Sequence, residues 1–600
     1  MQTITGKRHF TARRFETLRA LLNYCAEIYT DQPAYRYHEK PGGREIVRSF
    51  HQYVEDIDCF GTGLLQMGLA GCHISIIGRN CYEWAVAHNG IVNGTGVSAP
   101  LDRLLPTQEV VHLCRRGDVS ALIYHSQLHA TALAVAAENQ NIRWFIRMHD
   151  GGAAYDQAPG DERFLRFEDV LALGRKGLEA GDRSFIDATI DPEAMCSLVF
   201  TSGTGALSKG VMLCQRNITH NIHSVMGTLN VPKGQNALSI LPLHHTFENT
   251  VGMYMVQAFG CCICFSDGFR FFNENLRQWH INILLGVPLV FDTLYSQIQK
   301  KLRQNKRLLL VQLLRHVTRL LRFLGIDLRR RIFRQILNGL GGGLNLIVCG
   351  AAAIDRGIVR FFNDIGIDFF CGYGLTEAAP VISVNNSFVN CYGSVGPPVA
   401  DIEVAIDTRD RRPGAIGEIL TRSGSVMLGY YKNPQDTAAV MTGEGWLRTG
   451  DLGRLDRHGC ITLTGRLKSM IVLNSGKKAF PEEIEVLLNQ IPGVRESFVW
   501  GASSGRGAVD ICARLVIDCS QLPEDCRTSP ELSARYLSGQ LDAVNRQMPS
   551  YKEIRFYYFS RRDVIHKENA IDRQAEQLQI RQELKSRSLE IQKIKGRWVD

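Results

Sequence analysis

The 600-residue sequence lacks an apolar run long enough to cross a bilayer. Its longest apolar run, Val251 to Phe265, falls short of the roughly 20 residues that a transmembrane helix needs and contains Gln257 and Gly260. The N-terminal residues MQTITGKRHFTARRFETL contain no apolar core of the kind found in secretory signals. We therefore expect a cytoplasmic protein without a transmembrane helix.

Cysteine is present, but the spacing of metal-ligating cysteines is missing. Seventeen cysteines are scattered along the chain, and the run Cys261-Cys262-x-Cys264 has no second pair or histidines at zinc spacing. Buried thiols in a reducing compartment are expected instead of a zinc site. Hydrophobic content of 45% and charged content of 22% are ordinary for a globular protein, and the net charge of +9 permits an anionic partner without requiring one.

The length predicts several structural units, and the pattern of elements divides them. From His73 onward, short apolar runs alternate with helical periodicity, which predicts an α/β domain with a mainly parallel sheet. After Gly393, short strands and turns indicate a β-rich subdomain of that large domain. We expect an N-terminal domain over 1–464, a small mobile α+β domain over 465–574, and a charged helical tail over 575–600. Residues 150–161 are expected to form a loop.

A basic insertion over residues 296–340 interrupts this alternation. Its leucines recur at helical spacing among many basic residues, and Asp327 is its single acid. The pattern predicts an amphipathic helical pair broken near Gly325, and it suits peripheral contact with an anionic membrane. A solvated helical insertion packed on its own domain gives the same pattern. Nucleic-acid binding is not expected, because interleaved aromatic residues are missing.

The stretch Leu198 to Met212, LVFTSGTGALSKGVM, predicts a buried strand that enters a small, hydroxyl-rich loop ending at Lys209. Glycine lets a backbone approach a ligand closely, successive amides form an anion nest, and hydroxyls and a lysine add donors. The loop differs from the GxxxxGK[ST] phosphate loop, because no serine or threonine follows Lys209. Alone, it could equally be a polar surface turn.

Further motifs follow along the chain, and they favour a phosphate-binding loop over a polar surface turn. They are TSGTGALSKGV (from Thr201), LPLHHTFE (from Leu241), CGAAA (from Cys349), GYGLTE (from Gly372), GWLRTGDLG (from Gly445), GRLKS (from Gly465) and SGKKAFPEEIE (from Ser475). Together they resemble the motifs of the adenylate-forming (AMP-binding) superfamily, over nearly the whole chain. The resemblance is to the bacterial long-chain fatty acid–CoA ligases in particular, including their basic insertion.

The resemblance implies a role for each matched residue. Tyr373 would stack on adenine, Asp451 would accept hydrogen bonds from the ribose hydroxyls, and Glu377 would bind Mg²⁺. His245 would line the entrance of the acyl pocket, and Lys468 would be the hinge of the mobile domain. Catalysis would involve Thr376, Glu377 and Lys209. The nucleotide-binding set is Thr201, Ser202, Gly203, Thr204, Gly205, Lys209, Gly350, Ala351, Gly372, Tyr373, Gly374, Thr376, Asp451 and Arg466.

Two departures from the family pattern affect catalysis. Gly205 replaces a threonine of the phosphate loop and removes one hydroxyl donor. Aligning Ile571 and Arg573 with the family's C-terminal motif places Ala570 where the catalytic lysine belongs. Loss of a cation that stabilises the transition state costs on the order of hundreds-fold in rate. Lys567, three residues earlier, would substitute only if the loop were rearranged.

Two functions remain open at this stage. One is an ATP-dependent ligase that activates a medium- or long-chain fatty acid as acyl-AMP and transfers it to CoA or to the phosphopantetheine thiol of a carrier protein. It would use ATP, Mg²⁺ and CoA, and would belong to fatty acid metabolism. The alternative is a degenerate family member that binds nucleotide or acyl-adenylate with little turnover, because Ala570 occupies the lysine position.

Overall fold

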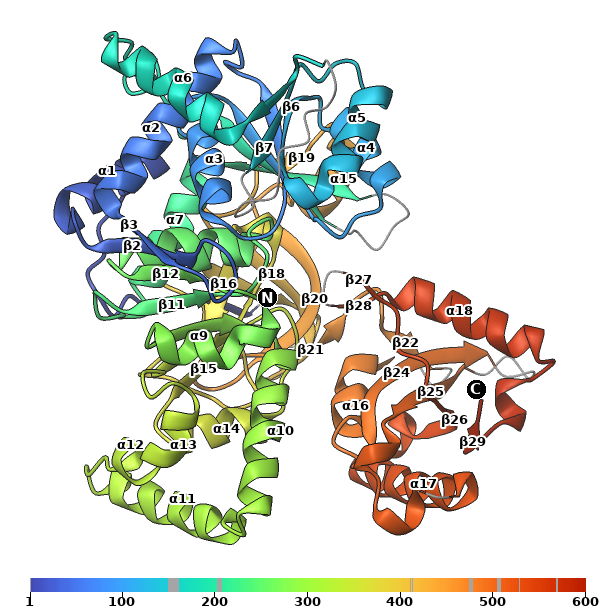
Figure 1. Ribbon diagram of the computed structural model, residues 1–600. Coiled ribbons are helices and arrows are strands. Elements are labelled where there is room, and N and C mark those ends of the chain that lie inside the picture. Colours follow the sequence, from blue (N-terminus) through green and yellow to red (C-terminus); the bar gives the residue numbers. More distant parts are fainter. Residues whose placement is uncertain are drawn as a thin grey trace.

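The computed structural model describes residues 2–148, 161–201, 208–410, 412, 414–473, 478–503, 509–527, 529–567 and 570–599. The chain forms a large N-terminal body and a smaller C-terminal body beside it (Figure 1). Except for Asp161, the loop predicted over 150–161 lies outside the described residues. The large body contains two mainly parallel sheets and one antiparallel sheet, and the small body is α+β, which confirms the fold class predicted from the sequence.

The first sheet has eight strands in the order β19-β10-β9-β5-β4-β6-β7-β8. Its strands β4 to β9 are parallel and almost continuously buried, as expected for a sheet covered on both faces. One face packs on α1, α2, α3 and α6, and the other packs on α4 and α5. The strands are β4 His73–Ile77, β5 Val97–Leu101, β6 Val119–His125, β7 Trp144–Met148, β8 Phe164–Arg166, β9 Met195–Thr201, β10 Lys209–Cys214 and β19 Gly429–Tyr430.

The second sheet also has eight strands, in the order β16-β15-β14-β13-β11-β12-β2-β3. One face shares the main core with the first sheet, and the other packs on α9, α10 and α14. The strands are β2 Pro33–His38, β3 Glu45–Ser49, β11 Asn236–Ser239, β12 Cys262–Phe265, β13 Ile283–Gly286, β14 Leu346–Cys349, β15 Asp368–Gly374 and β16 Val381–Val384. The alternation of strands and helices predicted from the sequence continues through β13, β14 and β15 of this sheet.

Helices of the large body follow the expected helical periodicity closely. For example, the helix predicted over Phe50 to Met67 is α2, which begins at a capping box formed by Ser49 and Gln52. The helices that cover the sheets are α1 Leu18–Tyr29, α2 Phe50–Gln66, α3 Tyr82–Val92, α4 Thr107–Arg116, α5 His129–Glu138, α6 Phe167–Glu179, α7 Gln215–Met226, a π-helix Phe247–Met255 followed by α8 Val256–Ala258, α9 Phe272–Gln278, α14 Arg356–Asp364 and α15 Pro434–Val440. Among the described residues, no helix combines the length and apolarity needed to cross a bilayer.

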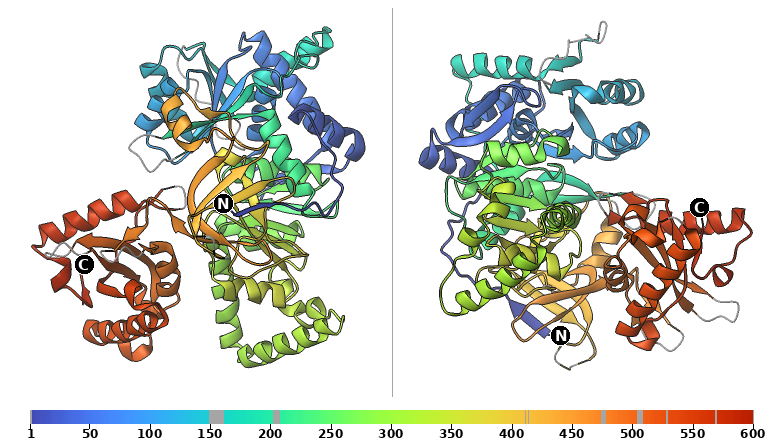
Figure 2. Two further views of the ribbon diagram at one scale, coloured as in Figure 1. Left: turned by 180° about the vertical axis from the view of Figure 1, so that it is seen from behind. Right: turned by 60° about the horizontal axis from the view of Figure 1, so that its bottom comes forward.

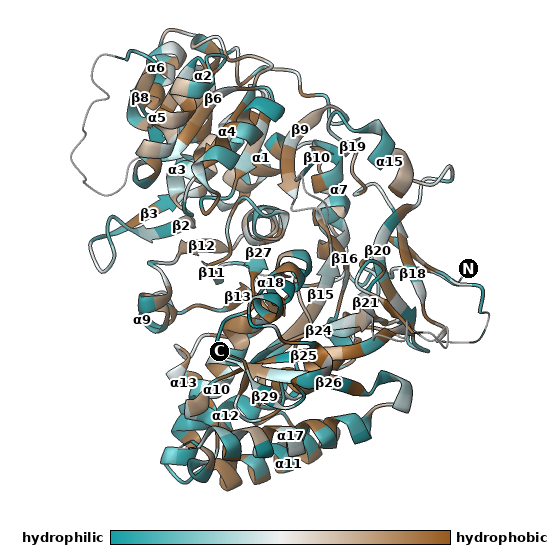
Figure 3. Cartoon of the chain, turned by 90° about the vertical axis from the view of Figure 1, so that its right-hand side faces the viewer, coloured by the Kyte–Doolittle hydropathy of each residue, from teal (hydrophilic) through white to brown (hydrophobic). Residues whose placement is uncertain are grey.

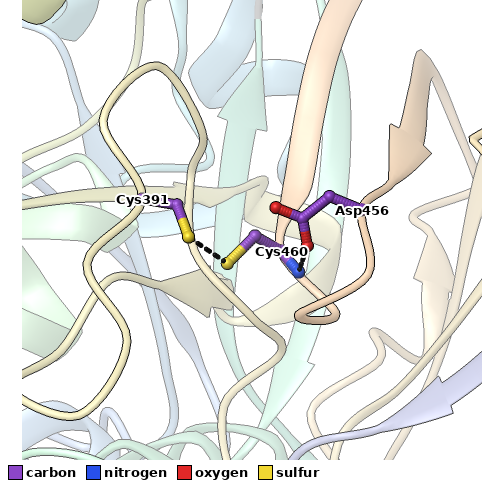
Figure 4. Close-up of side chains that lie close together, drawn as sticks. All are labelled: Cys391, Asp456 and Cys460. Atoms are coloured by element: carbon purple, nitrogen blue, oxygen red, sulfur yellow. Dashed lines mark hydrogen bonds between the residues drawn. The ribbon is translucent and has the colours of Figure 1, made fainter.

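The β-rich subdomain is a five-stranded antiparallel sheet in the order β1-β17-β18-β20-β21. The strands are β1 Gln2–Thr5, β17 Glu403–Asp407, β18 Gly417–Arg422, β20 Leu447–Leu455 and β21 Ile461–Arg466. The turn between β20 and β21 is held by Asp456, which accepts hydrogen bonds from the amides of His458 and Cys460. Figure 4 shows Cys460 beside Cys391, with their sulfur atoms 3.1 Å apart. All the cysteines are free thiols, and the run from Cys261 to Cys264 is buried as predicted.

The small body packs helices against a four-stranded sheet in the order β24-β25-β26-β29. The segment predicted as a charged helical tail contributes to it, because α18 is followed by β29, which pairs in parallel with β26. Val599, close to the C-terminus, is buried. The elements are β22 Ile471–Val472, β23 Lys478–Ala479, α16 Pro481–Leu488, β24 Val494–Ser503, β25 Val509–Ile517, α17 Pro530–Gln547, β26 Ile554–Ser560, β27 His566–Lys567, β28 Ala570–Ile571, α18 Arg573–Ser586 and β29 Arg597–Trp598.

The basic insertion is more divided than the predicted helical pair. It begins inside α10 Pro288–Gln304 and continues through α11 Leu308–Phe323, α12 Arg329–Ile332 and α13 Arg334–Gly339. The predicted break near Gly325 is present, and a further break separates α10 from α11 at residues 305–307. Figures 1 and 2 show α10 and α11 extending away from the sheets of the large body.

Candidate active site

One large cleft lies between the two bodies and reaches into the large one. Its lining contains every sequence-predicted site residue whose side chain the structure describes. These residues come from strand ends and loops of all three sheets of the large body, at positions far apart in the sequence. They are Thr201, Lys209, His245, Gly350, Ala351, Gly372, Tyr373, Gly374, Thr376, Glu377, Asp451, Arg466 and Lys468.

The predicted phosphate loop connects β9 to β10 as a hairpin. The two ends of the loop, Thr201 and Lys209, are partners in the antiparallel ladder, and the Thr201 hydroxyl donates to the Lys209 carbonyl oxygen at 3.4 Å. Ser202, Gly203, Thr204 and Gly205 lie outside the described residues. The structure therefore fixes both ends of the loop at the edge of the cleft.

Lys209 has an anionic partner across the cleft. Its Nζ lies 2.8 Å from Oδ2 of Asp436, in the first turn of α15, and 4.7 Å from the centre of the Tyr430 ring. The hydrogen bond from Lys209 lowers the pKa of the Asp436 carboxyl, so Asp436 is ionised at neutral pH. The lysine ammonium is thus held between a carboxylate and an aromatic face.

Glu377 is oriented by the same tyrosine. The Tyr430 hydroxyl donates to Oε1 of Glu377 at 2.8 Å, and burial together with this carboxylate raises the pKa of Tyr430. The hydroxyl of the preceding residue, Thr376, lies 3.4 Å from that of Thr246 in the LPLHHTFE segment. A carboxylate, two hydroxyls and an ammonium therefore converge at the ends of β15 and β10.

A second cluster of polar side chains, Tyr373, Asp451 and Arg466, also lines the cleft; together with the cluster around Glu377 and Lys209 it forms what we call the polar wall. The Tyr373 hydroxyl donates to Oδ2 of Asp451 at 2.7 Å, while Nε of Arg466 lies 3.5 Å from Oδ1 of Asp451. Asp451 and Arg466 are cross-strand partners in the β20–β21 hairpin, so the register of that hairpin brings them together. Burial raises the pKa of Asp451, and the charge of Arg466 opposes that rise.

Small residues keep this wall open. A Cβ atom added at Gly374 would lie 1.9 Å from the carbonyl oxygen of Pro380, so no larger residue fits there without a backbone shift. Ala351, which follows β14, has a φ of +71°, a left-handed conformation uncommon for a residue with a side chain. The backbone at Gly374 therefore packs closely on that of Pro380, and Gly350 and Ala351 add little side-chain bulk to the cleft that they line.

His245 of the LPLHHTFE segment also lines the cleft. Its ring centre is 4.1 Å from that of His244. Burial lowers the pKa of His244 well below its usual value, so that imidazole is neutral at pH 7. The lining of the cleft also includes a set of apolar side chains: Val225, Leu229, Val231, Phe247, Val251, Met255, Val256, Phe259, Leu285 and Val348.

Glu248 is a buried carboxyl group in the lining of the cleft. It lies at the start of the π-helix, and Ser239 donates to its Oε1 at 2.5 Å, whereas its Oε2 is buried without a hydrogen-bond partner among the described residues. Burial raises the pKa of Glu248 to about 8. Its side chain is therefore mainly protonated at neutral pH.

Glu248→Gln is expected to stabilise the protein relative to the wild type, increasingly so as the pH rises. The pKa of Glu248 is 4.5 in the unfolded chain and about 8 in the fold. The wild type therefore has the full stability of the neutral form below pH 4.5 and loses up to about 1.4 kcal/mol per pH unit as the pH rises towards 8. Glutamine stays neutral throughout. Chemical denaturation between about pH 5 and pH 8 measures the difference.

The matched control is Glu27→Gln, which replaces an exposed carboxylate of α1. Its effect on the free energy of unfolding should be small at every pH in the series. A constant difference between Glu248→Gln and the wild type across the series would contradict the raised pKa.

The C-terminal body meets the cleft through two features that the sequence singled out. Lys468 is exposed in the turn between β21 and β22, where the chain passes from one body to the other. The β27–β28 hairpin lies at the boundary between the bodies (Figure 1), and its register pairs Lys567 directly with Ala570. The backbone of Lys567 therefore lies beside that of Ala570. The side chains of both residues lie outside what the structure describes.

The sequence analysis missed three side chains that shape the cleft. Tyr430 and Asp436 lie more than two hundred residues after the TSGTGALSKGV motif. Neither belongs to a recognised motif, so nothing in the sequence indicates their contacts with Lys209. Glu248 belongs to the LPLHHTFE motif, but no role was predicted for it. Its neighbours Thr246, Asn249 and Thr250 are polar, so the local sequence does not mark Glu248 as a buried carboxyl group.

A family model described as "AMP-binding enzyme" matches residues 23–431 of the chain. Two curated relatives extend this similarity. The chloroplastic long-chain-fatty-acid–[acyl-carrier-protein] ligase AEE15 of Arabidopsis thaliana is 26% identical over 523 residues, covering 77% of this chain and 71% of the relative. The long-chain-fatty-acid–CoA ligase of Salmonella typhimurium is 26% identical over 517 residues, covering 82% of this chain and 84% of the relative.

Solved structures share the fold over nearly the whole chain. The anthranilate CoA ligase AuaEII in complex with anthranoyl-AMP superposes with a TM-score of 0.75 at 18% identity, covering 96% of this chain and 98% of that one. The O-succinylbenzoate coenzyme A synthetase of Bacillus subtilis, in complex with ATP and magnesium ion, gives 0.69 at 18% identity, covering 93% and 99%. At these identities the likeness establishes the fold alone.

Proposed function

The chain belongs to the AMP-binding enzyme family of acyl-activating, AMP-forming ligases, and from this premise we propose that it ligates a medium- or long-chain fatty acid to a thiol at the expense of ATP. The acceptor would be CoA or the phosphopantetheine of a carrier protein, as the names of the two curated relatives suggest. The observation that carries this proposal is the single cleft whose lining combines a polar wall, with its anion-binding groups, and a set of apolar side chains.

The polar wall fits a nucleotide. The Tyr373 ring and the open backbone at Gly350 and Ala351 suit a planar base, and Asp451 suits the two ribose hydroxyls because an ionised carboxylate accepts several hydrogen bonds. Arg466, already beside Asp451, would donate to the ribose as well. At the other end of the wall, Lys209 and the hydroxyls of Thr201 and Thr376 would donate to phosphate oxygens.

The proposed reaction has two steps. In the first, a carboxylate oxygen of the acid attacks the α-phosphorus of ATP, the bond from that phosphorus to the bridging oxygen breaks, and pyrophosphate leaves. In the second, the thiol sulfur attacks the acyl carbonyl carbon, AMP leaves with its phosphate oxygen, and the thiol proton is released. Because anions must meet in the first step, donors fixed before the reaction supply much of the stabilisation.

Glu377 would hold Mg²⁺, which supplies charge neutralisation at the phosphates when it is bound. The donor set fits this ion, because Mg²⁺ prefers a carboxylate oxygen together with phosphate oxygens. Tyr430 holds Oε1 of Glu377 and so fixes the direction of the carboxylate within the cleft. Thr376, adjacent in the chain, would orient an oxygen of the acid or of the α-phosphate.

The apolar side chains of the cleft support a fatty acyl substrate. They come from α7, the π-helix, β13 and β14, and a hydrocarbon chain gains about 0.8 kcal/mol for each methylene group that it buries. His245 would then stand where the polar head of the acid joins its hydrocarbon tail.

A second candidate function rests on Ala570. With alanine at the position of the family's catalytic lysine, the chain would bind nucleotide or acyl-adenylate with little turnover. The β27–β28 hairpin at the boundary between the bodies is where such a lysine would act on the cleft, so the substitution affects the proposed first step directly.

A substrate panel separates the two functions. Pyrophosphate release is measured with fatty acids of increasing length, with CoA and with a holo carrier protein as acceptors, and ATP binding is measured by calorimetry. We expect release that depends on a medium- or long-chain acid, together with thioester formation. Measurable ATP binding without turnover for any acid would contradict the ligase and support the second function.

A further inference from the structure

Helix α11 carries an apolar face that nothing in the described chain covers. Leu309 is 79% exposed, Leu313 is 62% exposed and Leu320 is 64% exposed. The exposed apolar residues of α11 and of the turn after it are Leu309, Leu310, Leu313, Val317, Leu320, Phe323, Leu324, Ile326 and Leu328. Large apolar side chains are usually buried, and a contiguous exposed group of them marks an interaction site.

Leucines among these residues form one stripe along the helix. Leu309, Leu313, Leu320 and Leu324 recur at intervals that place them on a single face of an α-helix. The opposite face packs on the large body, where Val311 and Thr318 are buried. There Arg315 and Arg319 both form ion pairs with Asp364 of α14, which fixes the rotation of α11. The apolar stripe therefore faces outward because the arginines anchor the other side.

The basic insertion that contains the stripe carries an excess of positive charge. Of the basic residues in the insertion, Arg315, Arg319 and Arg329 form ion pairs with carboxylates. The others form no ion pair within 4 Å in the described part of the chain, and they give this end of the molecule an uncompensated positive charge; they are Lys300, Lys301, Arg303, Lys306, Arg307, Arg322, Arg330, Arg331 and Arg334. Figure 3 shows α11 at the lower edge of the molecule, with hydrophobic residues along it.

We propose that α11 docks the protein on an anionic membrane surface, with the apolar stripe in the headgroup region and the lysines and arginines of the basic insertion on the lipid phosphates. Helices that bind at a membrane interface have an apolar face and basic residues beside it. Each basic residue near an anionic leaflet adds to binding, and basic clusters are attracted to acidic lipids. The surface is independent of the proposed function, since none of its residues lines the cleft.

A single helix, α10, connects this surface to the cleft. α10 has its N-terminal residues, among them Leu289 and Val290, in the lining of the cleft, and its C-terminus leads into α11. Docking through α11 would therefore place the cleft one helix length from the lipid.

Vesicle flotation of the full chain tests the proposal. The probes are vesicles of phosphatidylcholine alone and vesicles in which part of it is replaced by phosphatidylglycerol. We expect the wild type to bind the anionic vesicles and Leu313→Gln/Leu320→Gln to bind them at least about tenfold more weakly, because two leucines no longer enter the lipid. Arg322→Gln/Arg331→Gln should also bind more weakly, and high salt should weaken the wild type.

The matched control is Leu532→Gln/Leu578→Gln, which changes two exposed leucines of the C-terminal body and should bind like the wild type. Circular dichroism and thermal unfolding confirm that each variant is folded. Equal binding to both kinds of vesicle, binding to neither, or full binding by Leu313→Gln/Leu320→Gln would overturn the proposal. Binding to an acidic carrier protein that this variant loses, without vesicle binding, would also overturn it. Pyrophosphate release is measured separately, without vesicles. Loss of vesicle binding therefore does not count against the proposed function.

Discussion

Ala570→Lys is expected to raise the rate of acyl-AMP formation by about a hundredfold, measured as pyrophosphate release at saturating ATP and fatty acid. The substitution adds a cation where charge develops between the carboxylate and the α-phosphate. The β27–β28 hairpin that contains this position lies at the boundary between the two bodies. The second step, transfer to the thiol, should change much less.

Lys567→Ala is the comparison that decides which residue acts in the wild type. Because the hairpin pairs Lys567 with Ala570, the lysine can serve from the opposite strand. If it does, Lys567→Ala loses adenylation on the order of a hundredfold and Ala570→Lys restores it in the double variant. If Ala570→Lys has no effect while Lys567→Ala abolishes adenylation, Lys567 alone is the working lysine. No effect from either variant would remove both residues from the reaction.

Glu377→Gln is expected to lower pyrophosphate release by about a hundred- to a thousandfold, and to raise the Mg²⁺ concentration needed for half-maximal rate. Glutamine keeps the size of the side chain and one carbonyl oxygen, but it removes the charge that would hold the ion. A rate within a few fold of the wild type would remove Glu377 from the metal site.

Tyr430→Phe is the matched control for Glu377→Gln. It removes the hydroxyl that holds Oε1 of Glu377 and leaves the carboxylate charge in place. We expect a loss of at most about tenfold, because only the orientation of the carboxylate is relaxed. Equal losses for the two variants would mean that the hydrogen bond, and not the charge, matters at this position.

The elements that the sequence predicted best are those whose signal is local. The strand from His73 to Ile77 has its predicted bounds, because a short apolar run between polar turns has few other solutions. The site residues in motifs also lie on one cleft, since strand ends of parallel sheets meet at one edge.

Other features depend on contacts between distant segments and could not be predicted from periodicity. The ion pair of Lys209 with Asp436 joins β10 to α15, and the pairing of β29 with β26 depends on residues at the end of the chain that read as a charged helix. The outward face of α11 was equally undetermined. Its leucines predicted an amphipathic helix, but only the ion pairs of Arg315 and Arg319 with Asp364 decide which side is buried.

The partnership of Lys209 with Asp436 has a consequence for how selective the cleft is towards anions. A phosphate that binds Lys209 would share the three N–H donors of its ammonium group with the ionised carboxylate of Asp436, or would displace that carboxylate. Asp436 is thus a tethered competitor, present at a fixed effective concentration that no dilution lowers. A weakly held anion such as inorganic phosphate loses this competition. If ATP binds as proposed, its base and ribose add contacts that inorganic phosphate lacks, so the proposed site would favour the whole nucleotide.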